Sequence, residues 1–261
     1  MQPAIALKQK LSRSQPVLGA LLINQVSLEL VEVAINAGLD YLILDNEHNS
    51  HNGPSIADAC RLGRLANFPI LIRPHRTDTE SVGHTMDLGP CGLLLPMVES
   101  AVQLDGVRDG LYLPPRGKRR PGGPGNRWVT EFNYETFKTQ VEDHVIILPQ
   151  IESPLGVERA QEIAEHEITT ALAVGPFDLS MRLGKGGEVG QPRHREVLQQ
   201  IREVARAAGK EPWMIGNGEQ LVGDGYKFLC IAEPTLLLEN ALKTLVRKIH
   251  HVASGGTNQP G

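Results

Sequence analysis

The chain has 261 residues, a length that suits one or two domains and that single α/β barrels commonly reach. Apolar residues make up 41%, charged residues 21%, and the formal net charge is −4, which together exclude a collagen, a coiled coil and a disordered acidic chain. The mild acidity, three widely spaced cysteines and short apolar runs predict a cytoplasmic protein without a disulfide framework, a membrane span or a nucleic-acid partner.

Short runs rich in valine, isoleucine and leucine recur along the chain and predict strands. In chain order these are Val17–Ile23, Tyr41–Leu44, Ile70–Arg73, Gly92–Leu95, Val145–Glu152, Ala171–Gly175, Trp213–Gly216 and Phe228–Ile231. Most are apolar throughout, as in parallel strands that are covered on both faces. Segments with helical periodicity separate them, most clearly Ser27–Ala37, Arg193–Ala208 and Pro234–Ile249.

Strands that alternate with helices in this way predict one (β/α)₈ TIM barrel over residues 1–253, followed by a flexible tail at 254–261. The alternative is an open, doubly wound sheet. That fold would need a glycine-rich phosphate motif after its first strand, where this chain has INQVSLE. We therefore favour the barrel.

Polar residues that strand stability does not require lie at the carboxyl ends of the predicted strands. They are Asp45, Asn46, Glu47 and His48 after the second strand, Arg73 at the end of the third, Gln150 and Glu152 in the fifth, and Asp178 after the sixth. In a barrel these ends surround the active site. Each acid alone could be a helix cap or a surface group, and His48 alone a structural histidine. Their coincidence on one rim favours an enzyme.

The residue types on this rim indicate a metal-dependent reaction. Glu152 and Asp178 follow neighbouring strands, and two carboxylates with open positions for water suit Mg²⁺ or Mn²⁺ better than zinc. His48 could act as a general base oriented by Asp45. The other nearby histidines lack zinc-site spacing, so we expect them on the surface; they are His51, His75 and His84.

Residues 114–131 (PPRGKRRPGGPGNRWVTE) interrupt the alternation. They hold too many glycines and prolines for a helix, and five basic side chains. We expect this loop at the active-site rim or at a contact with another subunit. It is either a solvated flap or a specificity loop in which Arg119 or Arg120 binds an acidic group of the substrate.

Six motifs, in order over roughly residues 17–210, resemble the HpcH/HpaI family of class II pyruvate aldolases. They are LDNEHNSHN (44–52), LIRPHRTD (71–78), MDLGPCGLLLPMVES (86–100), LPPRGKRRPGG (113–123), LPQIESPLGV (148–157) and VGPFDLSMRLG (174–184). The resemblance implies a (β/α)₈ barrel that binds Mg²⁺, Mn²⁺ or Co²⁺. It also implies a homo-oligomer, usually a hexamer made from dimers that exchange their last helix.

The resemblance also implies how the substrate and the metal are held. Glu152 and Asp178 would be the metal ligands, with Gln150 beside them. Arg73 would lie over the keto oxygen of pyruvate. The backbone N–H groups of Phe177 and Asp178 would hold the pyruvate carboxylate.

The reaction that the resemblance implies is cleavage or formation of 4-hydroxy-2-oxo acids from pyruvate and an aldehyde through a metal-stabilised enolate. His48, paired with Asp45, would be the acid/base, and Asp87 would belong to the site of a neighbouring subunit. Leu21 and Leu113 replace an aromatic residue that is common in the family, which leaves the aldehyde open. Oxaloacetate decarboxylation, Claisen-type condensation and a binding protein without turnover are the alternatives.

Overall fold

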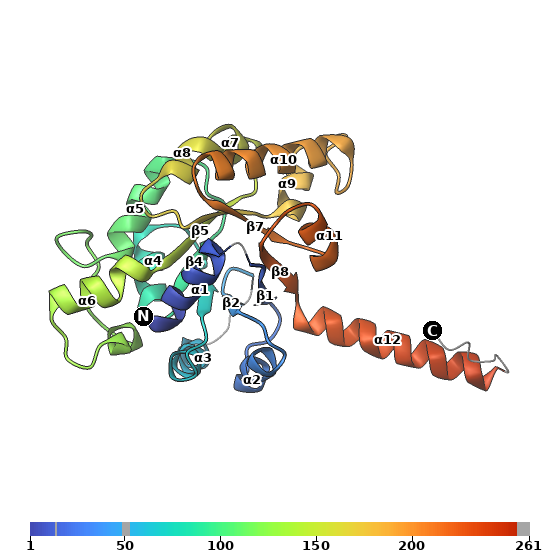
Figure 1. Cartoon of the computed structure of the whole chain (residues 1–261), viewed down its shortest axis with the longest axis horizontal. Coiled ribbons are helices and arrows are strands. Elements are labelled where there is room, and N and C mark those ends of the chain that lie inside the picture. The colour runs from blue at the N-terminus through green and yellow to red at the C-terminus, as the bar shows by residue number, and fades with distance from the viewer. Residues whose placement is uncertain (14, 49–52, 255–261) are drawn as a thin grey trace.

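A computed structural model describes residues 1–13, 15–48 and 53–254 of the chain. Its strands form one closed barrel in which each strand lies parallel to the next in chain order and the eighth pairs with the first. Helices surround the barrel, and the last helix extends away from it (Figure 1). The predicted single (β/α)₈ barrel is confirmed, and the open sheet is excluded. The predicted tail lies outside the described residues, apart from Ser254.

The strands lie within two residues of their predicted bounds. They are β1 Val17–Leu22, β2 Tyr41–Asp45, β3 Ile70–Arg73, β4 Gly92–Leu95, β5 Ile146–Ile151, β6 Ala171–Val174, β7 Glu211–Ile215 and β8 Phe228–Ala232. Strands β2 to β6 are buried over their whole length, which explains why their sequences do not alternate between apolar and polar residues.

The three predicted helices correspond to α2, α10 and α12, and α12 continues four residues beyond its predicted end. The helices are α1 Gln2–Ser12, α2 Leu28–Asn36, α3 Gly53–Leu65, α4 Thr79–Asp87, α5 Ala101–Leu111, α6 Tyr134–Gln140, α7 Pro154–Glu158, α8 Ala160–Glu165, α9 Pro176–Arg182, α10 Pro192–Ala207, α11 Gly218–Gly223 and α12 Pro234–Ala253, with short 3₁₀ turns η1 Pro124–Trp128 and η2 Glu142–His144. Within the described ranges, every helix is too short or too polar to cross a membrane.

The unpredicted helix α1 covers the amino end of the barrel. It buries Ala4, Leu7 and Leu11, and Lys8 Nζ donates to the carbonyl oxygen of Val145 at 3.0 Å. Val145 directly precedes β5, so this contact lies at the end where the strands begin. The opposite, carboxyl end of the barrel is the one that holds the predicted site.

A hydrogen-bonded pair of large aromatic side chains fills the barrel interior. Trp213 Nε1 donates to the Tyr41 hydroxyl at 2.7 Å, and that hydroxyl donates to the carbonyl oxygen of Leu229 at 2.8 Å. The Tyr41 ring lies against Gly19, where an added Cβ would come within 2.3 Å of the ring. Glycine is therefore required at position 19 because of space.

We expect Gly19→Ala to lower the free energy of unfolding by about 1–3 kcal/mol, the usual cost of overpacking a core. Thermal or denaturant unfolding measures this change. Gly223→Ala is the matched control, since nothing lies within 4 Å of a Cβ at that helical position. Equal stability of the two variants would contradict the packing argument.

The loop at residues 114–131 connects α5 to β5 and therefore lies at the amino end of the barrel. The prediction that it borders the rim of its own barrel is wrong, because a connection from a helix to the next strand returns to the end where strands begin. The loop packs on the end of α4, where Cβ atoms at Gly123 and Gly125 would come within 2.6 Å of the backbone oxygens of Asp87 and Met86.

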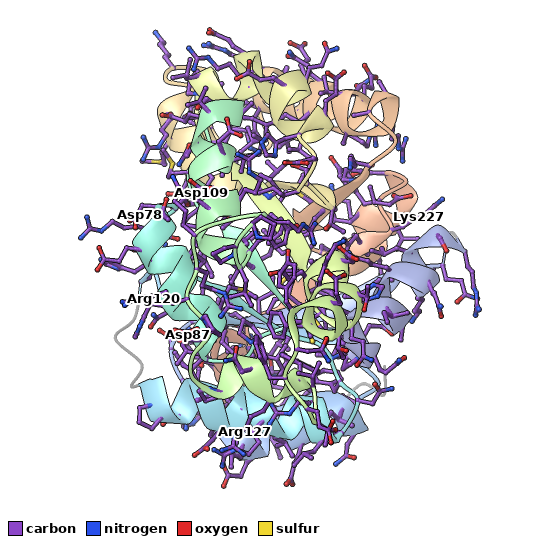
Figure 2. The ribbon with its side chains drawn as sticks, turned by 90° about the vertical axis from the view of Figure 1, so that its left-hand side faces the viewer. Asp78, Asp87, Asp109, Arg120, Arg127 and Lys227 are labelled. Atoms are coloured by element: carbon purple, nitrogen blue, oxygen red, sulfur yellow. The ribbon has the colours of Figure 1, made fainter. Side chains whose placement is uncertain are left out.

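Three of the five basic side chains of this loop have acidic partners within the chain, so the loop is not a solvated flap. Arg119 is buried, donates from Nη1 to Asp87 Oδ1 at 2.8 Å and from Nε to the Leu111 carbonyl oxygen at 3.1 Å. Lys118 pairs with Asp109 and Arg116 with Asp143, each at 2.7 Å. Arg120 and Arg127 are exposed; Figure 2 labels both, together with Asp87 and Asp109.

Candidate active site

A buried ion pair joins the ends of β2 and β3. Asp45 and Arg73 are register partners, and the guanidinium donates from Nε to Oδ1 at 2.8 Å and from Nη2 to Oδ2 at 2.7 Å. Asp45 is 0% exposed and Arg73 5%. Burial lowers the pKa of Arg73, but the hydrogen bonds and charge of Asp45 outweigh burial and raise it. The guanidinium of Arg73 thus stays charged and is held in a fixed plane at the rim.

The side chain next to His48 is Glu47, to which the sequence argument gave no role. Glu47 Oε2 lies 3.6 Å from His48 Nε2 and 3.2 Å from Arg73 Nε, while the His48 side chain is 55% exposed. Asp45 instead accepts from Arg73 and, at 3.0 Å, from the Glu47 N–H. Within the described residues, Glu47 is the acid that lies within 4 Å of His48, and the pairing of His48 with Asp45 stays a prediction.

Glu152 follows β5 and is 3% exposed. Its Oε2 accepts the backbone N–H of Met97 at 2.9 Å, and Met97 holds a left-handed φ of 51°, a conformation that costs about 1–2 kcal/mol in a residue with a side chain. A Cβ at Gly175 would come within 2.3 Å of Glu152 Oε1 and 2.8 Å of Gln150 Nε2. Position 175 therefore requires glycine, because the side chains of Glu152 and Gln150 pack directly against its Cα.

Asp178 completes an acidic cluster with Glu47 and Glu152. It lies half-buried in the first turn of α9, directly after the exposed Phe177. Burial, and then the charges of Glu47 and Asp178, raise the pKa of the Glu152 carboxyl to about 7. Burial also raises the pKa of Glu47, despite the nearby Arg73. The structure thus brings the two predicted metal ligands together with a third carboxylate.

These residues fit a divalent metal ion. The carboxylates of Asp45, Glu47 and Glu152 surround Arg73, and Asp178 adds a fourth carboxylate beside Glu152. The amide oxygen of Gln150 is buried without a hydrogen-bond partner. Such an excess of buried oxygen ligands suits a hard cation that keeps waters or substrate in its other positions. Over residues 1–13, 15–48 and 53–254, no set of three or more His, Cys, Asp or Glu groups is arranged to hold a metal. The fit therefore rests on Glu152, Asp178 and the amide oxygen of Gln150, with water or substrate in the other positions.

The raised pKa of Glu152 predicts how the metal-free protein responds to pH. A carboxyl whose pKa of about 7 in the folded protein exceeds its ordinary value of 4.5 stabilises the fold fully below pH 4.5 and loses that contribution as pH rises through 7. We expect Glu152→Gln to match the wild type near pH 4.5 and to become more stable than it above pH 7. Chemical denaturation across this range measures the difference.

Glu158→Gln, at an exposed position on α7, is the control and should follow the wild type at every pH. A constant difference between Glu152→Gln and the wild type would show that Glu152 does not titrate in this range.

The remaining sequence predictions fall outside this cluster. His75 and His84 are exposed, as predicted, and His51 lies outside the described residues. Asp87 ends α4 at the amino end of the barrel, where it pairs with Arg119, so within one chain it is remote from the rim. Its assignment to the site of a neighbouring subunit stays a prediction.

Comparison with known proteins places this geometry in a family. The model of the HpcH/HpaI aldolase/citrate lyase family matches residues 20–215, which include every residue of the rim described above. The chain belongs to the HpcH/HpaI aldolase/citrate lyase family. Aldolases of this family generally depend on a divalent metal ion, which agrees with the acidic cluster. Helix α12 lies beyond the matched residues.

Named members of the HpcH/HpaI family are similar over nearly the whole chain. A hydroxypyruvate/pyruvate aldolase from Pseudomonas aeruginosa is 29% identical, over 99% of this chain and 96% of the relative. A 2-keto-3-deoxy-L-rhamnonate aldolase from Escherichia coli is 27% identical, over 90% and 89%. The crystal structure of an HpcH/HpaI aldolase from Desulfitobacterium hafniense superposes with a TM-score of 0.86 at 26% identity, over 98% of each chain.

Proposed function

We propose that this protein is a metal-dependent pyruvate aldolase, an aldehyde-lyase that cleaves or forms 4-hydroxy-2-oxo acids. The observation that carries the proposal is the buried Asp45–Arg73 pair beside the carboxylates of Glu47, Glu152 and Asp178 at the catalytic end of a barrel of this family. The two aldolases named above support the same reaction type.

In this proposal Glu152 and Asp178 are the metal ligands, and Gln150 lies beside them as a further polar group of the site. Oxygen ligands favour Mg²⁺ or Mn²⁺, with Co²⁺ as a further candidate. When bound, the metal supplies Lewis-acid polarisation of a substrate carbonyl. The N–H groups of Phe177 and Asp178, in the first turn of α9, lack helical acceptors and hold the pyruvate carboxylate.

Arg73 places its fixed positive charge at the keto oxygen of pyruvate. Negative charge develops on this oxygen as the enolate forms, so a preorganised guanidinium stabilises the transition state more than the ground state. Asp45 keeps the guanidinium in its plane through two hydrogen bonds, and both side chains are already desolvated.

His48 moves the proton. In cleavage it accepts the proton of the 4-hydroxyl group, the bond between C3 and C4 breaks, the bonding electrons pass to the pyruvate enolate, and the aldehyde leaves. The proton then returns to the methyl carbon of pyruvate. Glu47 orients the imidazole, and Asp87 of a neighbouring subunit completes the site.

We further propose that the protein is a cytoplasmic homo-oligomer, a hexamer made from three dimers. Helix α12 supports this proposal because it stands away from the barrel (Figure 1) and leaves five of its leucines more than half exposed. They are Leu236, Leu237, Leu238, Leu242 and Leu245. Light scattering coupled to size-exclusion chromatography should give six times the 28.5 kDa chain mass.

The proposed reaction is tested by incubating the metal-loaded protein with pyruvate and a panel of hydroxyaldehydes, then identifying products by mass spectrometry. We expect aldol adducts that require the metal. A parallel incubation contains oxaloacetate. Release of carbon dioxide there, with no adduct in the first incubation, would establish a decarboxylase instead. Condensation with an acyl donor would establish a Claisen-type enzyme, and metal binding without turnover a binding protein.

A further inference from the structure

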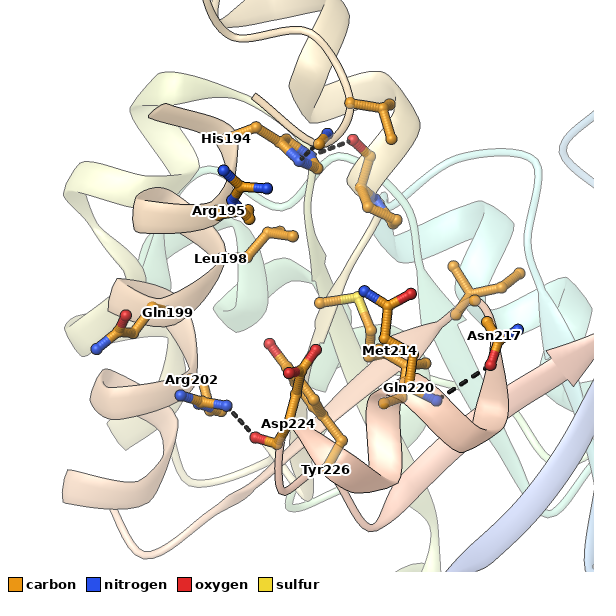
Figure 3. A pocket seen from close by; sticks show the side chains of 16 residues that line it. His194, Arg195, Leu198, Gln199, Arg202, Met214, Asn217, Gln220, Asp224 and Tyr226 are labelled. Carbon is orange, nitrogen blue, oxygen red and sulfur yellow. Dashed lines mark hydrogen bonds between the residues drawn. The ribbon is translucent and has the colours of Figure 1, made fainter. Parts of the chain in front are cut away.

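A buried histidine outside the acidic cluster links two backbone segments near the candidate metal site. His194 is the third residue of α10 and is 2% exposed. Its Nε2 lies 2.9 Å from the carbonyl oxygen of Pro176, and its Nδ1 lies 3.4 Å from the backbone nitrogen of Gly190. Figure 3 shows this side chain at the end of a cavity of about 430 Å³ between α10 and α11.

The two backbone partners assign a role to each ring nitrogen. A carbonyl oxygen only accepts, so Nε2 donates to Pro176. The N–H of Gly190 only donates, so Nδ1 accepts from it. Both ring nitrogens of His194 are therefore used by the backbone.

One of the two segments that His194 joins carries the candidate metal ligand Asp178. Pro176 is the first residue of α9, and Asp178 lies two residues later in the same turn. Gly190 ends a glycine-rich segment at 184–190, with left-handed φ values of 73° at Gly184, 83° at Gly186 and 81° at Gly190. Glycine is flexible in the unfolded chain, so the hydrogen bond from Gly190 to His194 holds a flexible segment near the start of α9.

We propose that His194 is a positioning residue for the metal site: its Nε2–H bond to Pro176 sets the position of the α9 turn, and hence of Asp178. The inference rests on the proposed metal role of Asp178. Groups that orient a metal ligand typically contribute 10–100-fold to metal affinity. Within α9, the Ser180 hydroxyl donates to the Phe177 carbonyl oxygen at 2.6 Å and so stiffens the same turn.

Two amide substitutions separate the two bonds of His194. Glutamine places a donor near the position of Nε2, so His194→Gln retains the bond to Pro176 and loses the acceptor for Gly190. Asparagine places an acceptor near the position of Nδ1, so His194→Asn retains the contact with Gly190 and does not reach Pro176. His194→Phe keeps the ring volume without either nitrogen. The adjoining cavity leaves room for each side chain.

The test is titration of Mn²⁺ into the metal-free full chain. Binding is measured by calorimetry and by the electron paramagnetic resonance signal of free Mn²⁺. We expect His194→Asn and His194→Phe to bind Mn²⁺ about tenfold more weakly than the wild type, and His194→Gln to remain within about threefold of it. Thermal unfolding first shows that each variant is folded; His194→Phe takes the place of His194→Asn if the latter is not.

Wild-type Mn²⁺ affinity in folded His194→Asn and His194→Phe would overturn the inference, as would equal weakening in all three variants, because packing alone would then explain the effect. Asp178→Asn separates this failure from that of the proposed function. If Asp178→Asn binds Mn²⁺ like the wild type, the metal site itself is wrong and the inference falls with it.

Discussion

Replacing His48 by alanine should lower turnover by about 10²–10⁴-fold while leaving Mn²⁺ and pyruvate binding nearly unchanged. This is the usual loss when a positioned proton-transfer group is removed. The expectation follows from the geometry, because His48 is 55% exposed and contacts Glu47, whereas Asp45 and Arg73 form their own buried pair. Steady-state cleavage assays give kcat and KM, and calorimetry gives the two affinities.

His75→Ala is the matched control, because His75 is also exposed and follows the neighbouring strand β3. It should keep wild-type turnover. Exchange of the pyruvate methyl protons with deuterated solvent tests the step directly. Exchange at the wild-type rate in His48→Ala would show that another group is the base.

Asp178→Asn should lower metal affinity and activity together by at least about tenfold, since the site has only two assigned carboxylate ligands and each removal takes one negative charge from the cation. Glu152→Gln should act in the same direction.

Glu188→Gln controls for net charge, because Glu188 is an exposed acid on the segment that follows α9. It should bind Mn²⁺ like the wild type. Calorimetric titration and metal-dependent activity measure both properties. Full activity of Asp178→Asn after removal of metal would contradict the metal assignment.

The barrel could be predicted because its signals are local. Buried parallel strands are continuously apolar, and several of the helices between them begin at a recognisable cap, such as Ser27 before α2. The rim residues could also be predicted, since chain order alone places strand ends side by side in a closed barrel. The predicted start of β7 was two residues too late, because Glu211 and Pro212 do not resemble a buried strand.

Contacts between distant segments could not be predicted. The pairing of Asp45 with Arg73 depends on side-chain orientation, so the sequence suggested only His48 as a partner of Asp45. Residues 114–131 were placed at the wrong end because their composition resembles a functional loop, although their position after a helix determines the end of the barrel at which they lie. Similarly, His194 and Pro176 are 18 residues apart, and no motif connects them.

The two tryptophans of the chain stand in unlike surroundings, which makes them intrinsic fluorescent reporters. Trp213 lies in the barrel interior, bonded to Tyr41, and should emit at short wavelength until the strands separate. Trp128 lies in η1 beneath Arg64, whose guanidinium carbon is 5.6 Å from the ring centroid. Emission from Trp128 should instead follow the loop at the amino end. Single Trp→Phe variants would therefore follow barrel opening and loop detachment as separate optical signals in one unfolding experiment.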